Sequence, residues 1–175
     1  VQALVSRGEF LTAYTPYQPE VSQGTLQSAY DFQSLVCQLF DMDVANAGMY
    51  DGASSLAEGA LMACRVTRRY KVAYVDTLSP AYLDVIATYT ASQGIDLHPV
   101  SSVTSSSLEP DTACLVVQHP NFFGYLEDMA GLAQTAHDAG ALLVVSTDPT
   151  ALGMFTPTGS YGADIVTAEG QPLGI

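Results

Sequence analysis

Four short apolar runs constrain the fold of this chain more than any other feature. KVAYVD, TACLVVQ, ALLVVS and ADIVTA each have the length and the β-branched content of a buried strand. The stretches between the first three runs contain helical segments of about a dozen residues, with apolar positions every three or four residues. Strands that alternate with helices in this way build a parallel sheet that is buried on both faces, so the predicted fold class is α/β.

Helix start and stop signals place helices between these strands. The clearest case begins at Ser79, which suits the N-cap, while Pro80 suits the first helical position and Gly94 the end. Four of the five cations crowd into RVTRRYK, where they favour the C-terminus of the preceding helix through its dipole. The expected helices cover residues 25–41, 51–69 and 79–94 and a segment that ends near 139, and the expected strands cover 42–48, 71–76, 95–100, 112–118, 141–146 and 163–168.

Composition indicates one domain with an unusually uncharged surface. Of the 175 residues, 48% are hydrophobic and 13% are charged, against roughly 25% charged in an ordinary soluble domain. No run reaches the roughly 18 apolar residues that a membrane helix needs, and no leader opens the chain. We therefore expect another chain, or further parts of a longer polypeptide, to cover part of this surface. The expected division is an entry segment over residues 1–24 and a partial α/β domain over residues 25–175.

Charge and cysteine usage exclude several partners. The net charge of −13 repels phosphate backbones, so nucleic acid is not an expected partner, and no membrane contact is expected either. Cysteines 37, 64 and 114 are widely spaced in apolar contexts without a CxxC, which predicts buried reduced thiols, no metal site and a cytoplasmic location. The three histidines are scattered and are expected to be structural or on the surface.

Ligands of open parallel sheets bind beyond the carboxyl ends of the strands, which directs attention to two loops. In MYDGASS, residues Gly52, Ala53, Ser54 and Ser55 begin a helix and offer N–H and hydroxyl groups to an anion. The alternative is that the carboxylate of Asp51 itself caps this helix and repels a phosphate.

Asp148 follows the apolar run ALLVVS directly. At that place an acid can meet the ring nitrogen of a ligand and keep it protonated. It can equally form the turn before Pro149, and spacing favours neither role. The dinucleotide, P-loop and nucleophile-elbow motifs are all absent from the sequence.

The loop TPYQPEVSQG is stiffened by two prolines and carries aromatic, amide and acidic groups that suit a recognition surface. The alternative is an ordinary proline-rich entry to the helix that follows. The candidate contact residues are Tyr14, Thr15, Tyr17, Gln18 and Glu20.

Five stretches together carry a resemblance to a known family: TAYTPYQPEVSQGTLQ, DVANAGMYDGASSLAE, QHPNFFGYLED, GALLVVSTDPTALG and YGADIVTAEGQPLGI. They resemble subunit 1 of glycine dehydrogenase (decarboxylating), the P protein of the glycine cleavage system, from Glu9 to Ile175. The resemblance implies a three-layer, mostly parallel sheet of the aspartate-aminotransferase large-domain type, here truncated. It also implies a component of an oxidoreductase that uses pyridoxal 5′-phosphate (PLP) to decarboxylate glycine and passes the aminomethyl group to the lipoyl H protein.

The resemblance also implies a division of labour between two subunits. In this family the PLP-bearing lysine belongs to subunit 2, and aligning the GAD-containing strand puts Pro172 in the place of that lysine. Proline has no amine that could hold the cofactor. Lys71 is the only lysine of the chain, and it opens a strand, which puts it at the wrong end for the ligand crevice. The resemblance therefore implies no covalent PLP and no catalytic residue here, with residues 52–55 and Asp148 as relics of a cofactor site.

The expected partners are subunit 2 and the lipoyl H protein within an oligomer, with the TPYQPE loop in contact with subunit 2. Two alternatives remain open at this point. The chain is a non-catalytic dimerising module, or it is an independent PLP-dependent transaminase or lyase whose lysine lies beyond Ile175. Subunit 1 of this family continues on both sides of the region, so we expect a fragment of a longer protein with an exposed sheet edge.

Overall fold

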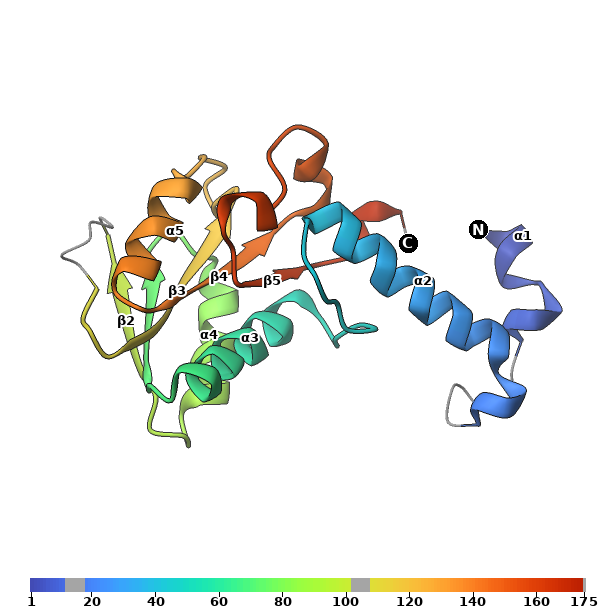
Figure 1. The fold of residues 1–175 in the computed structure, drawn as a ribbon, viewed down its shortest axis with the longest axis horizontal. Helices are drawn as coiled ribbons and strands as arrows, with labels where there is room; N and C mark the ends of the chain where they lie inside the picture. Colours follow the sequence, from blue (N-terminus) through green and yellow to red (C-terminus); the bar gives the residue numbers. More distant parts are fainter. Residues whose placement is uncertain (12–17, 102–107, 175) are drawn as a thin grey trace. The chain divides into compact units, whose positions relative to one another are not determined.

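The computed structural model describes residues 1–11, 18–101 and 108–174, and the chain forms two compact units, Val1–Gly48 and Met49–Ile175 (Figure 1). The predicted strands over residues 71–168 all fall in the second unit, whereas the helix predicted over 25–41 belongs to the first. The expected division into residues 1–24 and 25–175 stays a prediction.

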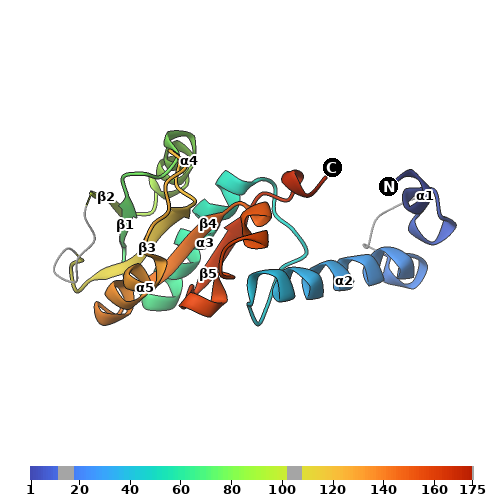
Figure 2. The same cartoon turned by 90° about the horizontal axis from the view of Figure 1, so that it is seen from above.

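The second unit is built on a five-stranded sheet in the order β2-β1-β3-β4-β5, and all its neighbouring strands pair in parallel (Figures 1 and 2). β3 is central and buried along nearly its whole length, while β2 and β5 form the two edges. This arrangement confirms the predicted α/β class. The strands are β1 (Lys71–Val75), β2 (Asp96–Val100), β3 (Thr112–His119), β4 (Leu142–Thr147) and β5 (Ile165–Ala168).

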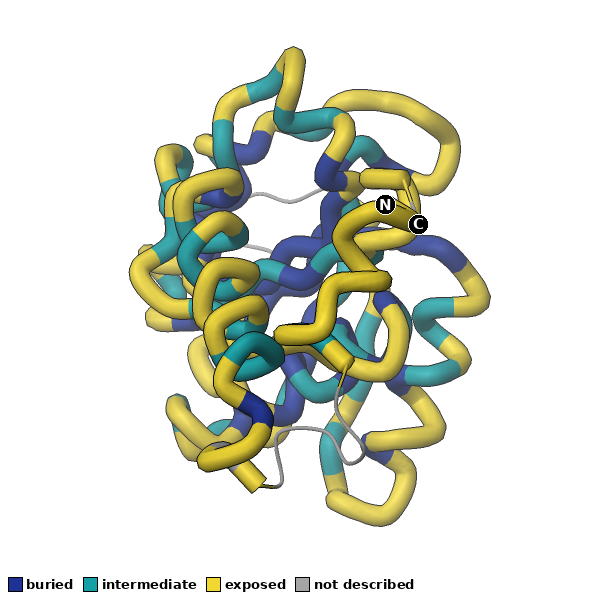
Figure 3. Tube along the Cα trace, turned by 90° about the vertical axis from the view of Figure 1, so that its right-hand side faces the viewer, coloured by how far each residue is buried: buried dark blue, intermediate teal, exposed yellow. Residues whose placement is uncertain are grey.

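Helices cover both faces of the sheet and complete three layers. Helices α3 (Gly52–Thr67) and α4 (Pro80–Thr90) pack on one face, and α5 (Met129–Asp138) packs on the other. Side chains of β3 alternate between the two faces, so Cys114 and Val116 join the α3 core while Leu115 and Val117 join the α5 core. Figure 3 shows buried residues along the strands beneath more exposed helices.

A glycine lets α3 approach the sheet closely. A Cβ atom at Gly59 would lie 3.3 Å from Cγ2 of Ile165 and 3.5 Å from Cγ1 of Val144. These contacts join α3 to β4 and β5, the strands whose carboxyl ends lie near the beginning of the helix. The close packing therefore fixes where the N-terminus of α3 stands at the sheet edge.

The first unit contains α1 (Gln2–Val5), two short 3-10 turns at Gly8–Phe10 and Pro19–Val21, and α2 (Gln23–Phe40). Phe40 is the only buried residue of the long helix α2. Its sequence has helical apolar spacing, yet within the described residues that apolar stripe stays mostly exposed. The exposed large apolar side chains of α2 are Tyr30, Phe32, Leu35 and Leu39.

Most element boundaries agree with the sequence prediction to within a few residues, with one clear error. The strand predicted over residues 42–48 is wrong, because this segment has no strand conformation and pairs with no strand. Instead the backbone oxygen of Ala45 accepts a 2.6 Å hydrogen bond from the side-chain amide of Gln33 on α2. An extended sequence becomes a strand only when a neighbouring strand satisfies its backbone groups.

One arginine of the cluster, Arg69, serves a different helix from the one expected. Arg69 donates from one guanidinium nitrogen to the backbone oxygens of Thr112, Ala139 and Gly140 at 2.9, 3.2 and 2.7 Å. Two of these carbonyls follow the last turn of α5, so the cation stabilises the C-terminal end of α5 and ties it to the start of β3. Arg65 does lie in the last turn of α3, as predicted.

We expect Arg69→Met to lower the free energy of unfolding by about 1–3 kcal/mol, because three carbonyls lose a charged donor. Arg65→Met is the matched control, since Arg65 is exposed and its nearest carboxylate, Glu58, is 3.6 Å away. That control should change stability by less than about 0.5 kcal/mol. Urea unfolding followed by circular dichroism measures both, and equal effects would contradict the assigned role of Arg69.

Candidate functional site

The N-terminus of α3 stands at the carboxyl edge of the sheet and is capped by its own chain. Asp51 is the N-cap, and its Oδ1 accepts a 2.7 Å hydrogen bond from the backbone N–H of Ser54. The hydroxyl of Ser54 accepts in return from the N–H of Asp51 at 3.2 Å, which completes a capping box. Of the two roles that the sequence left open for MYDGASS, the structure thus shows the cap.

A second carboxylate reaches the same helix end from far along the chain. Oε2 of Glu169, which directly follows β5, accepts a 3.0 Å hydrogen bond from the N–H of Gly52. A Cβ atom at Gly52 would lie 2.6 Å from the hydroxyl of Tyr82 on α4, so a larger residue at this position would displace the Tyr82 side chain. Burial raises the pKa of Tyr82, and the charges of Glu169 and Asp51 raise it further. Sequence reasoning missed both Tyr82 and Glu169, although Glu169 opens the EGQPLG motif.

A pocket of about 200 Å³ lies beside this helix end. Its walls include Asp148, Glu169 and Pro172, so the structure brings together two sequence segments, STDPTALG and EGQPLGI. The carboxylate of Asp148 is exposed and accepts from the N–H and hydroxyl of Thr150 at 2.8 and 2.7 Å, which is the turn role. Pro172 sits in a short 3-10 turn, Gln171–Leu173.

Lowering the pH tests the Asp51 cap. Hydrogen bonds from the backbone and side chain of Ser54 hold the pKa of Asp51 below its usual value. A lowered folded-state pKa means that the cap stabilises the fold above the unfolded pKa of about 3.9 and that this contribution is lost as the pH falls through the folded value. We expect Asp51→Ala to melt a few degrees lower than the unchanged chain at pH 7. This difference in melting temperature should disappear as the pH falls below about 4.

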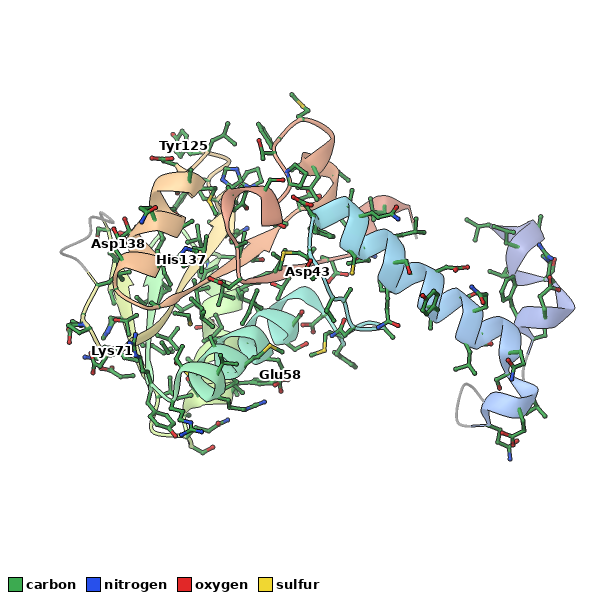
Figure 4. All side chains as sticks on the ribbon, viewed as in Figure 1. Asp43, Glu58, Lys71, Tyr125, His137 and Asp138 are labelled. Carbon is green, nitrogen blue, oxygen red and sulfur yellow. The ribbon has the colours of Figure 1, made fainter. Side chains whose placement is uncertain are left out.

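The control for this prediction removes the same charge elsewhere. Asp43 lies in the first unit, is exposed and is labelled in Figure 4. Asp43→Ala should leave the melting temperature nearly unchanged at either pH. A gap between Asp51→Ala and the unchanged chain that persists unaltered at pH 3 would contradict the capping role, and differential scanning calorimetry decides it.

The loop that follows β3 forms a rigid platform at the same edge of the sheet. The buried side chain of Asn121 donates to Oε1 of Glu127 at 2.6 Å and accepts from the N–H groups of Phe123 and Tyr125 at 3.0 Å each. The hydroxyl of Thr77 donates to the same Glu127 oxygen at 2.9 Å. Four apolar side chains of this ordered loop are exposed: Phe122, Phe123, Tyr125 and Leu126.

His119 ends β3 beneath that loop and is held neutral by its surroundings. Its Nδ1 accepts a 3.3 Å hydrogen bond from the N–H of Glu127, and its ring packs edge-on against Phe155 at 6.0 Å. Burial lowers the pKa of His119, and the charge of Glu127 opposes this only in part. The sequence expectation of a structural role for this histidine agrees with these contacts.

Lys71 lies at the opposite end of the strands from this edge, as predicted. Its Nζ forms ion pairs with Glu109 and Asp111, and these carboxylates raise its pKa. Figure 4 shows Lys71 and Tyr125 toward different ends of the sheet. The only lysine of the sequence is therefore remote from the pocket beside α3.

Tyr14, Thr15 and Tyr17 lie outside the described residues, while Gln18 and Glu20 are exposed in the first unit. Cys64 and Cys114 are free and buried and Cys37 is free and half-buried, in agreement with reduced thiols. Within the described ranges no group of three potential metal ligands gathers, and no helix there is long and apolar enough to cross a bilayer.

Comparison with known proteins shows the family. The family model described as glycine cleavage system P-protein matches residues 1–175. The chain is 53% identical to the probable glycine dehydrogenase (decarboxylating) subunit 1 of Desulforamulus reducens and 53% identical to that of Thermomicrobium roseum. Each alignment covers 100% of this chain but 41% of the relative, so the chain spans about two fifths of the length of these relatives.

Solved structures agree with this result. The chain matches a crystal structure of glycine decarboxylase (P-protein) of the glycine cleavage system in inhibitor-bound form with a TM-score of 0.92 and 46% identity, over 99% of this chain and 41% of that one. A putative O-acetylhomoserine (thiol)-lyase from Campylobacter jejuni, solved with a pyridoxyl-lysine monophosphate, shares the fold with a TM-score of 0.67 at 10% identity, over 91% of this chain and 43% of that one. The chain belongs to the glycine cleavage system P-protein family.

Proposed function

We propose that this chain is part of the subunit of a PLP-dependent glycine decarboxylase that does not carry the cofactor. In the assembled enzyme, glycine loses carbon dioxide and the remaining aminomethyl group passes to the lipoyl arm of H protein. PLP, held by subunit 2, supplies the electron sink for this decarboxylation. The present chain supplies a wall of the partner's pocket and the scaffold that supports it.

The observation that carries this proposal is the set of contacts at the carboxyl edge of the sheet. Pro172 lines the pocket there, at the position that the family resemblance gives to the PLP lysine, and Lys71 is at the other end of the strands. The first N–H groups of α3 pair with Asp51 and Glu169, whose charges oppose a phosphate. These residues do not fit a PLP held by this chain alone.

Exposed apolar side chains support the assembly part of the proposal. They gather on α2 and on the ordered loop after β3, in a chain with few charges. Apolar patches on a soluble protein mark surfaces that another chain covers. We propose that subunit 2 covers them, and that the TPYQPE loop contacts its pocket. The free thiols fit a reducing cytoplasm.

Reconstitution tests the proposed function. We expect no release of carbon dioxide from glycine by this chain alone, and glycine-dependent release once subunit 2 and lipoyl H protein are added. Tyr17→Ala should lower that turnover about 10-fold, because an aromatic contact in an interface carries a large share of its binding energy. Tyr50→Ala is the control, since Tyr50 lies outside the TPYQPE loop, α2 and the loop after β3. Turnover by the chain alone, or equal turnover with both variants, would refute the respective part of the proposal.

A further inference from the structure

Helix α3 has the features of an anion-binding helix at the ligand edge of a parallel sheet. It runs for 16 residues, begins with GASS, and points its N-terminus toward the carboxyl ends of β4 and β5. Backbone N–H groups at such an end have no partner within the helix and carry part of the positive end of its dipole. Phosphates bind at helix ends of this kind.

In this chain, backbone N–H groups at the N-terminus of α3 donate to acceptors of the chain itself. The N–H of Gly52 donates to Glu169, and the N–H of Ser54 donates to the carboxylate of Asp51. The N–H of Ala53 also acts on the Asp51 carboxylate and helps to lower its pKa. The N–H of Ser55 donates to the backbone oxygen of Asp51 at 3.0 Å. The N–H groups of Gly52, Ser54 and Ser55 are therefore taken up by acceptors of the chain itself.

The contact from Glu169 is not an ordinary cap. Asp51 already caps the helix, whereas Glu169 lies 117 residues further along the chain and adds a second negative charge to the same helix end. Tyr82 lies against Gly52, and Cβ of Glu169 would be 3.5 Å from a Cβ at that position. The phenol and the glutamate therefore occupy the space directly in front of the first helical residue.

We propose that the carboxylate of Glu169 is an internal anion that closes the N-terminus of α3 to phosphate-bearing ligands. It takes up the Gly52 donor, and together with Asp51 it replaces the positive potential of the helix end by a negative one. This inference deepens the proposed function, because it gives a second physical reason, besides the missing lysine, why PLP belongs to the partner. The contact itself does not depend on that function.

Opening the site by substitution tests the proposal with inorganic phosphate as the probe. We expect Glu169→Ala to bind phosphate at least about 10-fold more tightly than the unchanged chain, as measured by phosphorus NMR and by a phosphate-dependent rise in melting temperature. Glu169→Gln keeps an acceptor for Gly52 but removes the charge, so it should show a smaller gain. Glu58→Gln removes the same charge from a half-buried position further along α3 and should show no gain.

Each outcome bears on the proposal. A folded Glu169→Ala or Glu169→Gln variant that binds phosphate no better than Glu58→Gln would overturn it. Saturable phosphate binding by the unchanged chain, with movement of the Gly52 amide resonance, would overturn it as well, and this measurement needs no variant. The readout is independent of glycine turnover, so failure of the reconstitution assay and failure of this inference are separate results.

Discussion

Replacing Leu115 by alanine is expected to lower the free energy of unfolding by about 2–5 kcal/mol, the largest effect of any substitution considered for this chain. Leu115 lies in the central strand β3, is 0% exposed, and has Ala73 and Leu143 as its neighbours in the adjoining strands. Truncation leaves a cavity that these strands cannot close, because the sheet is held in register on both sides of β3.

The matched control for Leu115 is Leu126→Ala. Leu126 is 57% exposed in the loop after β3, so its loss should change stability by less than about 0.5 kcal/mol. Urea unfolding followed by circular dichroism gives both values. Equal destabilisation by the two substitutions would mean that β3 is not the centre of the core.

Asn121→Ala is expected to cost about 2–4 kcal/mol, because it removes one side chain that satisfies several buried groups. Asn121 is 6% exposed and connects Glu127 with the N–H groups of Phe123 and Tyr125. After truncation these two N–H groups lose their acceptor and Glu127 loses a donor. The loop should then lose its order, and the amides of Phe123 and Tyr125 should exchange with solvent about 10-fold faster or more.

Phe123→Ala separates the ordered loop from its apolar surface. Phe123 is 65% exposed, so this substitution should leave stability and amide exchange nearly unchanged. If subunit 2 covers the loop, the same substitution should still weaken assembly. Stability losses of the same size in the two variants would show that the loop is held by its apolar side chains and not by Asn121.

The fold follows from the sequence where local signals and burial agree. The run TACLVVQ is apolar at every position but its ends, as a strand buried on both faces requires, and it became the central strand β3. Pro80 marked the start of α4 for the same reason, since its fixed φ angle suits the first helical turn. Strand polarity alone also placed Lys71 at the end remote from the pocket.

Other features depend on residues far apart in the sequence and could not be predicted from local patterns. MDVANAG has one β-branched residue, Val44, and whether so short a run forms a strand depends on a partner that no local pattern reveals. Glu169 was visible only as part of a motif, because its hydrogen bond to Gly52 requires the whole sheet to bring β5 beside α3. Arg69 was expected at the end of its own helix, whereas the fold directs it to the end of α5.

Asp51 shows a different limit of prediction from sequence. A helix that begins with small residues after an aspartate offers the same N–H groups to a ligand or to its own cap, and the sequence favours the cap because the carboxylate of Asp51 would repel a phosphate. The structure shows the cap, in which the carboxylate of Asp51 accepts from the N–H of Ser54. Asp148 is similar, since its bonds to Thr150 were as compatible with the sequence as a contact with a ligand.

The division of labour between subunits is tested most directly by locating PLP in the assembled enzyme. This chain, subunit 2 and lipoyl H protein are incubated with PLP, reduced with borohydride, digested and analysed by mass spectrometry for pyridoxyl-lysine. The account predicts that the label is on a lysine of subunit 2 and that Lys71 stays unmodified. A pyridoxyl group on Lys71, at a level comparable with the enzyme's active sites, would contradict it.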